Sequence, residues 1–91
     1  MQALTVESIA EHITKNHEAE AVEFINSKAR QFYGASYSRG TYGRLMLPLI
    51  KKHWPRLNLN GQSTRVALAI TGQLERKGYG YKTEAGAVHF A

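Results

Sequence analysis

The sequence contains no cysteine and no aspartate, and both absences narrow the kinds of site that it can carry. Without cysteine, the chain forms neither a disulfide framework nor a thiolate metal site. Carboxylate chemistry therefore depends on seven glutamates, five of which lie before residue 24. Nucleases and polymerases that hold two metal ions need clustered carboxylates, so the sequence disfavours such an enzyme.

Long apolar runs are missing as well. The longest, such as residues 66–70, are far shorter than the roughly 20 residues that a membrane-spanning helix needs. Met1 is followed by neither a basic nor an apolar segment, so we expect no secretory signal, no membrane association and a cytoplasmic location. A hydrophobic content of 43% in 91 residues is enough for one core, which predicts a single domain over residues 1–91.

Acidic side chains are absent from residues 24–74, although eight basic ones occur there. The eight are Lys28, Arg30, Arg39, Arg44, Lys51, Lys52, Arg56 and Arg65. The first 23 residues carry five glutamates and one lysine (−4), and the other 68 carry eleven bases and two glutamates (+9), which together give the net charge of +5. A field of one sign attracts polyanions, whereas the alternative is a solvated basic surface without a partner.

Apolar spacing predicts a pair of helices in the acidic part of the chain, residues 1–33. The first is expected at about 5–15, where Thr5 can cap a segment with apolar residues at helical spacing. The second is expected at about 17–33, with Asn16 as its cap. Two glutamates follow Asn16 in the first turn, where negative charge suits the helix dipole.

Residues 34–40 are small and polar with a glycine at each end, so we expect a loop there. A third helix is predicted at about 43–54. Pro48 would kink an established helix, which favours a regular start only near Leu45.

A fourth helix is predicted at about 63–77, capped by Asn60 or Ser63 and ended by glycine. Alternating apolar residues then predict a β-hairpin over 79–90. Two strands alone are marginal, so the hairpin must pack on the helices. The expected fold class is α+β, mostly α, with four helices followed by a C-terminal hairpin.

The order helix, link, helix and hairpin over residues 41–91 resembles the winged-helix variant of the helix-turn-helix DNA-binding superfamily. The Leu-Glu-Arg-Lys-Gly-Tyr stretch at 74–79 is similar to the join of helix and strand in many such domains. The resemblance implies that 63–77 is the recognition helix and 79–90 the wing. The family also has a short strand between its first two helices and a third strand beside the wing, and the sequence places neither. The link, 56–60, is longer than a simple helix-turn-helix turn.

On this interpretation the protein is a small regulator or accessory factor, of phage or mobile-element type, that binds double-stranded DNA. Arg65 could reach a guanine edge, and the free amides near Ser63 and Thr64 favour a phosphate. Other cations would position the DNA backbone. These are Arg39, Arg44, Lys51, Lys52, Arg56 and Lys82. A homodimer would read two half-sites about one helical turn apart.

A second interpretation is an adaptor or inhibitor that docks on an acidic partner protein, such as DNA-processing machinery. The helix face opposite the apolar ridge of 63–77 carries Leu68 and Gly72 four residues apart, together with Thr71 and Glu75. Leu68 over Gly72 is typical of a place where a helix or a partner protein packs closely, and Glu75 would repel phosphate. If the N-terminal helices cover this face, the fourth helix is central and cannot enter a groove, and the sequence alone does not show whether it is exposed or central.

Histidines are few and give no metal motif by spacing alone. His12 and His17 are five apart and fall on different predicted helices, so they lack the i, i+4 geometry of a helical zinc site. His53 is expected to pack beside Trp54. No nucleophile with an adjacent base occurs, so we expect neither catalysis, metal nor cofactor.

Overall fold

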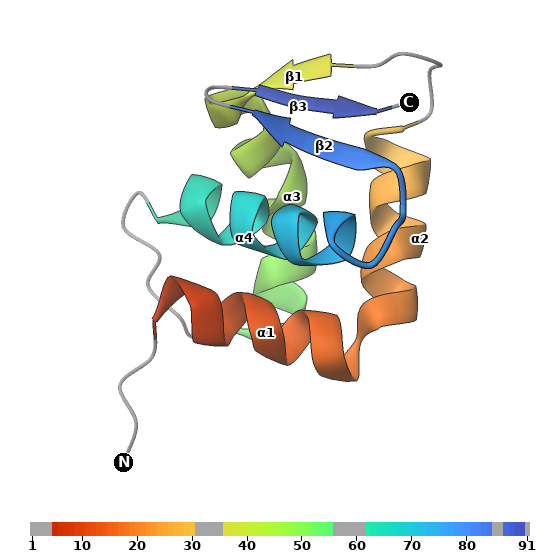
Figure 1. Ribbon diagram of the computed structural model, residues 1–91. Helices are drawn as coiled ribbons and strands as arrows, with labels where there is room; N and C mark the ends of the chain where they lie inside the picture. The colour runs from red at the N-terminus through yellow and green to blue at the C-terminus, as the bar shows by residue number, and fades with distance from the viewer. Residues whose placement is uncertain (1–4, 31–35, 56–61, 85–86, 91) are drawn as a thin grey trace.

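The computed structural model describes residues 5–30, 36–55, 62–84 and 87–90 (Figure 1). Its elements are α1 (Val6–Asn16), α2 (Glu18–Lys28), β1 (Ser36–Ser38), α3 (Arg39–His53), α4 (Ser63–Glu75), β2 (Tyr81–Glu84) and β3 (Ala87–Phe90). The expected class, α+β and mostly helical, is confirmed. No helix in the described part of the chain is long and apolar enough to cross a bilayer.

The first two helices meet at His17. Thr5 caps α1 as predicted, since its side chain accepts from the Ser8 amide and the Ser8 hydroxyl accepts in return from the Thr5 amide. The predicted cap of α2 is wrong. Asn16 still belongs to α1, where its side-chain amide donates to the carbonyl of His12 at 3.1 Å, so His17 takes the position between the helices. The α2 helix ends at Lys28, short of the predicted 33.

Helix α3 begins four residues earlier than predicted, at Arg39, and continues through Pro48. Proline cannot donate to the carbonyl four residues before it, here that of Arg44. Both Arg44 and Pro48 are exposed, so the carbonyl without an amide partner lies on the solvent side. This explains why the proline does not end the helix.

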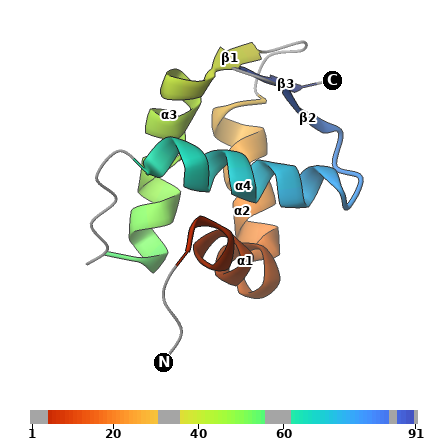
Figure 2. The same ribbon diagram turned by 60° about the vertical axis from the view of Figure 1, so that its left-hand side comes forward.

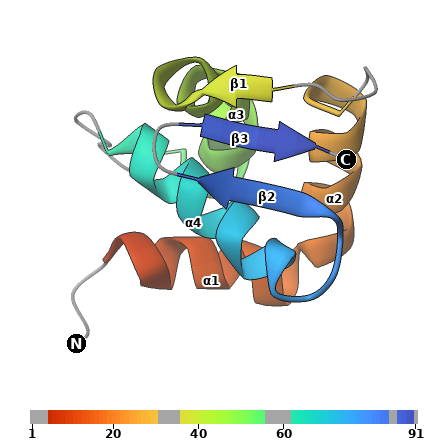
Figure 3. The same ribbon diagram turned by 45° about the horizontal axis from the view of Figure 1, so that its top comes forward.

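The sheet has three strands rather than the predicted two. The segment expected to be a loop contains β1, which pairs antiparallel with β3, and β3 pairs antiparallel with β2, giving the order β1-β3-β2 (Figure 3). Val88 stands between Tyr37 and Thr83 in the register. The predicted hairpin also began too early: Tyr79 lies in a turn between Gly78 (φ +92°) and Gly80 (φ +81°), before β2 starts.

Helix α4 is the central element. It packs against α3 and α1, and its other flank meets β2 (Figures 1 and 2). Five of its residues are buried in the core: Val66, Ala67, Ile70, Thr71 and Leu74. Helix α4 is therefore central to the core, but Arg65 near its start is exposed and Leu68 and Gly72 are only partly buried, so one side of the helix still faces solvent.

Candidate nucleic-acid interface

The solvent side of α4 is a narrow face between α1 and β2. Arg65 and Arg76 are exposed near its two ends, and three partly buried small or apolar residues lie between them. We call these five residues the outward face of α4: Arg65, Leu68, Ala69, Gly72 and Arg76. Their spacing places all of them on one side of a helix with 3.6 residues per turn.

Thr71 does not belong to this face, although its spacing in the sequence predicted that it lies there with Leu68 and Gly72. Its side chain is fully buried, donates to the carbonyl of Ala67 at 2.9 Å and shares a hydrogen bond with the Tyr42 hydroxyl. Because the two hydroxyls satisfy each other, a threonine can occupy the core without an unpaired polar group. Burial raises the pKa of the Tyr42 phenol, so the pair remains neutral.

The C-terminal half of α4 is held by polar side chains on both flanks. Toward α1, the Thr14 hydroxyl donates to Oε1 of Gln73 at 2.6 Å. Toward β2, Oε1 of Glu75 accepts from both the amide and the hydroxyl of Thr83, each at 2.9 Å. Sequence reasoning treated Glu75 only as a charge that repels phosphate, and no local pattern marked it or Gln73 as an anchor.

Just beyond α4, Lys77 forms an ion pair with Glu18 of α2 at 3.0 Å. The hydrogen bond from Lys77 lowers the pKa of the Glu18 carboxyl. This pair adds a third tether near the same end of α4, so Lys77 is used within the fold.

The N-terminal half of α4 has no comparable polar anchor among the described residues. Its N-cap, Gln62, makes no capping bond through its side chain, and the first turn contains no acid. Asn60, one of the two predicted caps, lies outside the described residues. Among the described residues, no side chain compensates the positive end of the helix dipole at the first-turn amides, an arrangement that favours an anion. Ser63 and Thr64, both predicted phosphate contacts, lie in this turn and are partly buried.

Close packing, rather than hydrogen bonding, fixes this end of α4. Thr64 lies directly against Gly43 of α3, where a β-carbon would come 2.8 Å from the Thr64 Cα and closer still to its hydroxyl. Figure 2 shows the start of α4 crossing α3. The glycine that permits a close helix approach is thus Gly43, which the sequence did not single out. At Gly72 a β-carbon would be 4.0 Å from the Thr83 hydroxyl, an ordinary contact with β2.

The predicted DNA-contacting cations fall into two groups. Four are exposed and have no acidic partner among the described residues: Arg39, Arg44, Lys51 and Arg65. Two others have acidic neighbours: Lys52 is paired with Glu20 at 2.6 Å, and Lys82 lies 3.8 Å from Glu84. Arg56 lies outside the described residues. The structure thus reduces the set of cations that can face a polyanion without first breaking an ion pair.

The four unpaired cations lie along α3 and at the start of α4. Arg44 and Lys51 are seven residues apart and share one side of α3. Arg44 follows Gly43 and Arg65 follows Thr64, so these two arginines flank the crossing of the helices. We call Arg39, Arg44, Lys51 and Arg65 the α3–α4 basic surface.

A groove of about 460 Å³ lies between α1 and the C-terminal half of α4. Charges of both signs line it, with Glu7 and Glu11 on one hand and Lys15, Arg76 and Lys77 on the other. Glu11 is paired with Lys15 at 2.6 Å, and Lys77 with Glu18 at 3.0 Å. The four cations of the α3–α4 basic surface lie at the N-terminal end of α4 and along α3, rather than in this groove.

Comparisons of the chain with protein-family models, with curated proteins and with solved structures found no match.

Proposed function

We propose that this protein is a small, non-enzymatic, winged-helix-like module that binds double-stranded DNA in the cytoplasm, as a regulator or accessory factor of phage or mobile-element type. The observation that carries the proposal is the α3–α4 basic surface: four exposed cations without an acidic partner in the described residues lie along α3 and at the start of α4, whose N-cap residue Gln62 makes no capping bond through its side chain. Phosphates of DNA bind such combinations of arginine, lysine and free helix amides.

Element order supports the same assignment. The winged-helix family has a short strand between its first two helices and a third strand beside the wing. Strand β1 lies between α2 and α3 and pairs with β3, next to the β2–β3 hairpin. On this reading α3 is the supporting helix, α4 the recognition helix and β2–β3 the wing.

The buried flanks of α4 define how it would meet DNA. Gln73 and Glu75 hold its C-terminal half against α1 and β2, so the N-terminal half approaches the major groove and Arg65 reaches the base edges. Arg39, Arg44 and Lys51 contact phosphates. A homodimer would place two such surfaces about one helical turn of DNA apart.

Titration of fluorescent duplex and of random single strand at two salt concentrations tests the proposal. Three neutralised phosphates predict a slope of log K against log salt of roughly −2.7, so affinity falls roughly 40-fold between about 50 and about 200 mM salt. Binding of the duplex weaker than about 10⁻⁴ M at the lower salt contradicts the proposal, because generic electrostatic attraction alone exceeds that.

Single substitutions separate base reading from phosphate contact. Arg65→Ala should weaken specific binding more than non-specific binding, whereas Lys51→Ala should weaken both alike and reduce the salt slope by about 1. Lys28→Ala is the charge-matched control, because Lys28 is exposed at the end of α2, away from the α3–α4 basic surface (Figure 1). Equal losses from all three variants would leave only a general effect of net charge.

The second candidate function is docking on a partner protein. The observation in its favour is the middle of the outward face of α4, where Leu68, Ala69 and Gly72 offer a small apolar surface. Such a surface suits a protein better than a phosphate backbone. Leu68→Ser separates the two functions: it leaves DNA affinity unchanged if Arg65 and the phosphate contacts dominate, and abolishes capture of a partner that packs on α4.

A further inference from the structure

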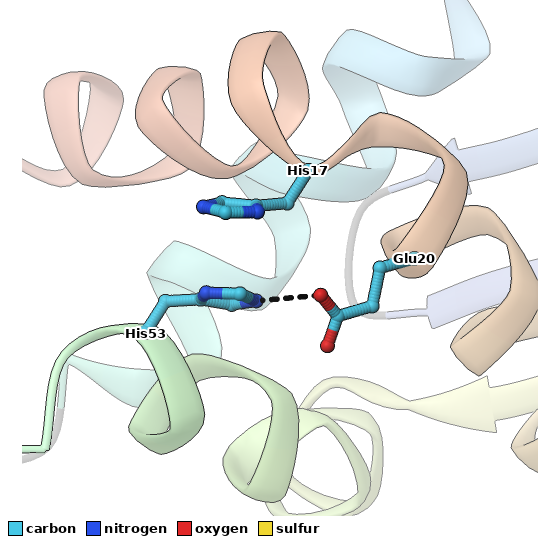
Figure 4. Close-up of side chains that lie close together, drawn as sticks. All are labelled: His17, Glu20 and His53. Atoms are coloured by element: carbon cyan, nitrogen blue, oxygen red, sulfur yellow. Dashed lines mark ion pairs between the residues drawn. The ribbon is translucent and has the colours of Figure 1, made fainter.

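Three potential metal ligands meet where the ends of three helices converge. His17 stands between α1 and α2, Glu20 lies in the first turn of α2, and His53 is the last residue of α3. Figure 4 shows the two imidazole rings stacked one above the other, with the Glu20 carboxylate beside their edges. The ring centroids are 3.9 Å apart and the planes are inclined by only 22°.

The distances suit one shared cation. Nε2 of His53 lies 3.1 Å from Oε1 of Glu20, and one ligand atom from each of the three residues falls within 4.8 Å of the other two. Ligand atoms of a tetrahedral zinc ion with bonds of about 2.0–2.1 Å are about 3.3–3.4 Å apart. The site therefore has to close by at most roughly 1.5 Å. The two stacked rings also have to tilt, because each imidazole nitrogen directs its lone pair in the plane of its own ring, so binding requires rotation of the histidine side chains.

The His53 nitrogen also lacks a satisfied hydrogen bond. Nε2 is buried, and its approach to Glu20 is close enough for an ion pair but is not aligned as a hydrogen bond with any described group. In neutral His53, a ring nitrogen without a proton would place its lone pair next to a carboxylate oxygen. Two Lewis bases at that distance need a proton or a metal cation between them, and a ligand atom of His17 within 4.8 Å of both supplies a third donor for a metal.

We propose that His17, Glu20 and His53 bind a Zn²⁺ ion through two imidazole nitrogens and one carboxylate oxygen, with water as the fourth ligand. Two histidines and a glutamate are a zinc ligand set that requires no cysteine. The spacing of the histidines could not predict this site, because His17 and His53 are 36 residues apart in the sequence and meet only in the folded chain.

Lys52 orients the carboxylate for this role. Its Nζ lies 2.6 Å from Oε2 of Glu20, so the salt bridge holds one oxygen and leaves Oε1 directed at the histidines. A group that is hydrogen-bonded to a ligating carboxylate fixes the orientation of that ligand. The hydrogen bond from Lys52 also lowers the pKa of the Glu20 carboxyl, which keeps Glu20 ionised.

Bound zinc would connect the junction of α1 and α2 to the end of α3. Helix α2 packs less extensively on α3 than α4 does. A metal ion held by both helices would therefore strengthen the contact between α2 and α3. The site does not include the α3–α4 basic surface, and its test is independent of DNA binding.

Calorimetric titration of the chelator-stripped full chain with Zn²⁺ tests the proposal. We expect one ion per chain and a rise in melting temperature of about 10 °C or more when free Zn²⁺ is at about 100 times its dissociation constant. Mg²⁺, which prefers oxygen ligands, should produce neither effect. Co²⁺ should give the intense visible absorption of a four-coordinate ion with nitrogen ligands.

Ligand and control variants locate the ion. His17→Gln, His53→Gln and Glu20→Gln should each weaken Zn²⁺ binding at least about 100-fold, since loss of a mere supporting group already costs 10- to 100-fold. His89→Gln removes a histidine outside the cluster and should change nothing, whereas His12 packs edge-on against His17 at 5.5 Å between ring centroids and is not a neutral control. His89 is an informative control because it also faces a glutamate, Glu84, at 3.8 Å, but without a second histidine.

Two results would overturn the site. One is the absence of saturable Zn²⁺ binding by the folded wild-type chain, which would leave a protonated His53–Glu20 ion pair only. The other is an equal loss of affinity in the His89 control and in the three ligand variants, which would indicate scattered surface binding. Should His53→Gln lose its helical circular dichroism, Glu20→Gln, which keeps the side-chain size, decides between these outcomes.

Discussion

The two ends of α4 are fixed by different kinds of interaction. Near its C-terminus, Gln73, Glu75 and Lys77 each bond to a neighbouring element, namely α1, β2 and α2. At its N-terminus, the described residues provide only the close packing of Thr64 on Gly43, while Arg65 is exposed and the first-turn amides have no side-chain cap.

The two halves of α4 therefore differ in role: the C-terminal half stabilises the fold, and the N-terminal half can contact a partner. Polar groups that are satisfied inside the fold cannot also contact a partner without an energetic cost, so the C-terminal half of α4 is committed to the structure. The N-terminal half keeps its dipole, its amides and Arg65 available. A nucleic acid would therefore be read by the first two turns of α4, and the rest of the helix would serve to hold them in place.

Gly43→Ala is the substitution with the largest expected effect on the packing of the N-terminal end of α4. The new methyl group would overlap the Thr64 side chain and backbone, so α4 has to move away from α3. Overpacking of this kind should lower the free energy of unfolding by about 2–3 kcal/mol, measured by urea denaturation. The separation of the helices should also displace Arg65 and weaken DNA binding.

Gly40→Ala is the matched control for that experiment. Gly40 lies in the first turn of the same helix, and a β-carbon there meets nothing within 4 Å. Because alanine is the better helix former, stability should be unchanged or should rise by up to about 1 kcal/mol. A similar loss in both variants would show that the approach of Thr64 is not what constrains residue 43.

The next largest effect concerns the C-terminal end. Glu75→Ala removes both hydrogen bonds to Thr83, and we expect a loss of about 1–2 kcal/mol, since the carboxylate is charged but only half-buried. Hydrogen exchange of β2 amides should accelerate more than that of α3. Glu23→Ala, an exposed glutamate of α2 without an ion pair in the described structure, should change stability by less than about 0.5 kcal/mol.

Gln62→Glu should move stability and binding in opposite directions. A carboxylate at the N-cap complements the dipole and should raise stability by about 0.3–1 kcal/mol. The same negative charge competes with DNA phosphate, so duplex affinity at low salt should fall by about tenfold. The side chains are nearly identical in shape, which makes the wild type its own control. Unchanged duplex affinity would show that DNA does not bind at this end of α4.

Helices with strong local signals could be predicted from the sequence. Thr5 has both a cap and an apolar segment behind it, and the ridge of Val66, Ile70 and Leu74 marks one face of α4, so both helices were placed to within two residues. Strand β1 was missed because Ser36–Ser38 has no periodicity of its own and becomes a strand only by pairing with β3. Pro48 misled because sequence alone does not show which side of a helix faces solvent.

The candidate sites were less predictable for a related reason. The charge run predicted a basic surface, but it could not show that Glu20 pairs with Lys52, while Arg44 and Arg65 meet no acid in the described structure. Such pairings join α2 to α3, helices whose relative position is set by the core. The same holds for His17 and His53, whose contact depends on how the end of α3 returns to the start of α2.

The smallest expected effect is the acid sensitivity of the tether at Lys77. Since the hydrogen bond from Lys77 lowers the pKa of Glu18 below its ordinary 4.5, the pair contributes stability above that pH and loses it as the pH falls through the folded-state pKa. Urea denaturation at a series of pH values should show that Glu18→Gln is less stable than the wild type at neutral pH and that this difference shrinks as the pH falls below 4.5. Glu23→Gln should follow the wild type throughout. A difference between the wild type and Glu18→Gln that stays constant as the pH falls would mean that packing, and not the charge of Glu18, holds this end of α4.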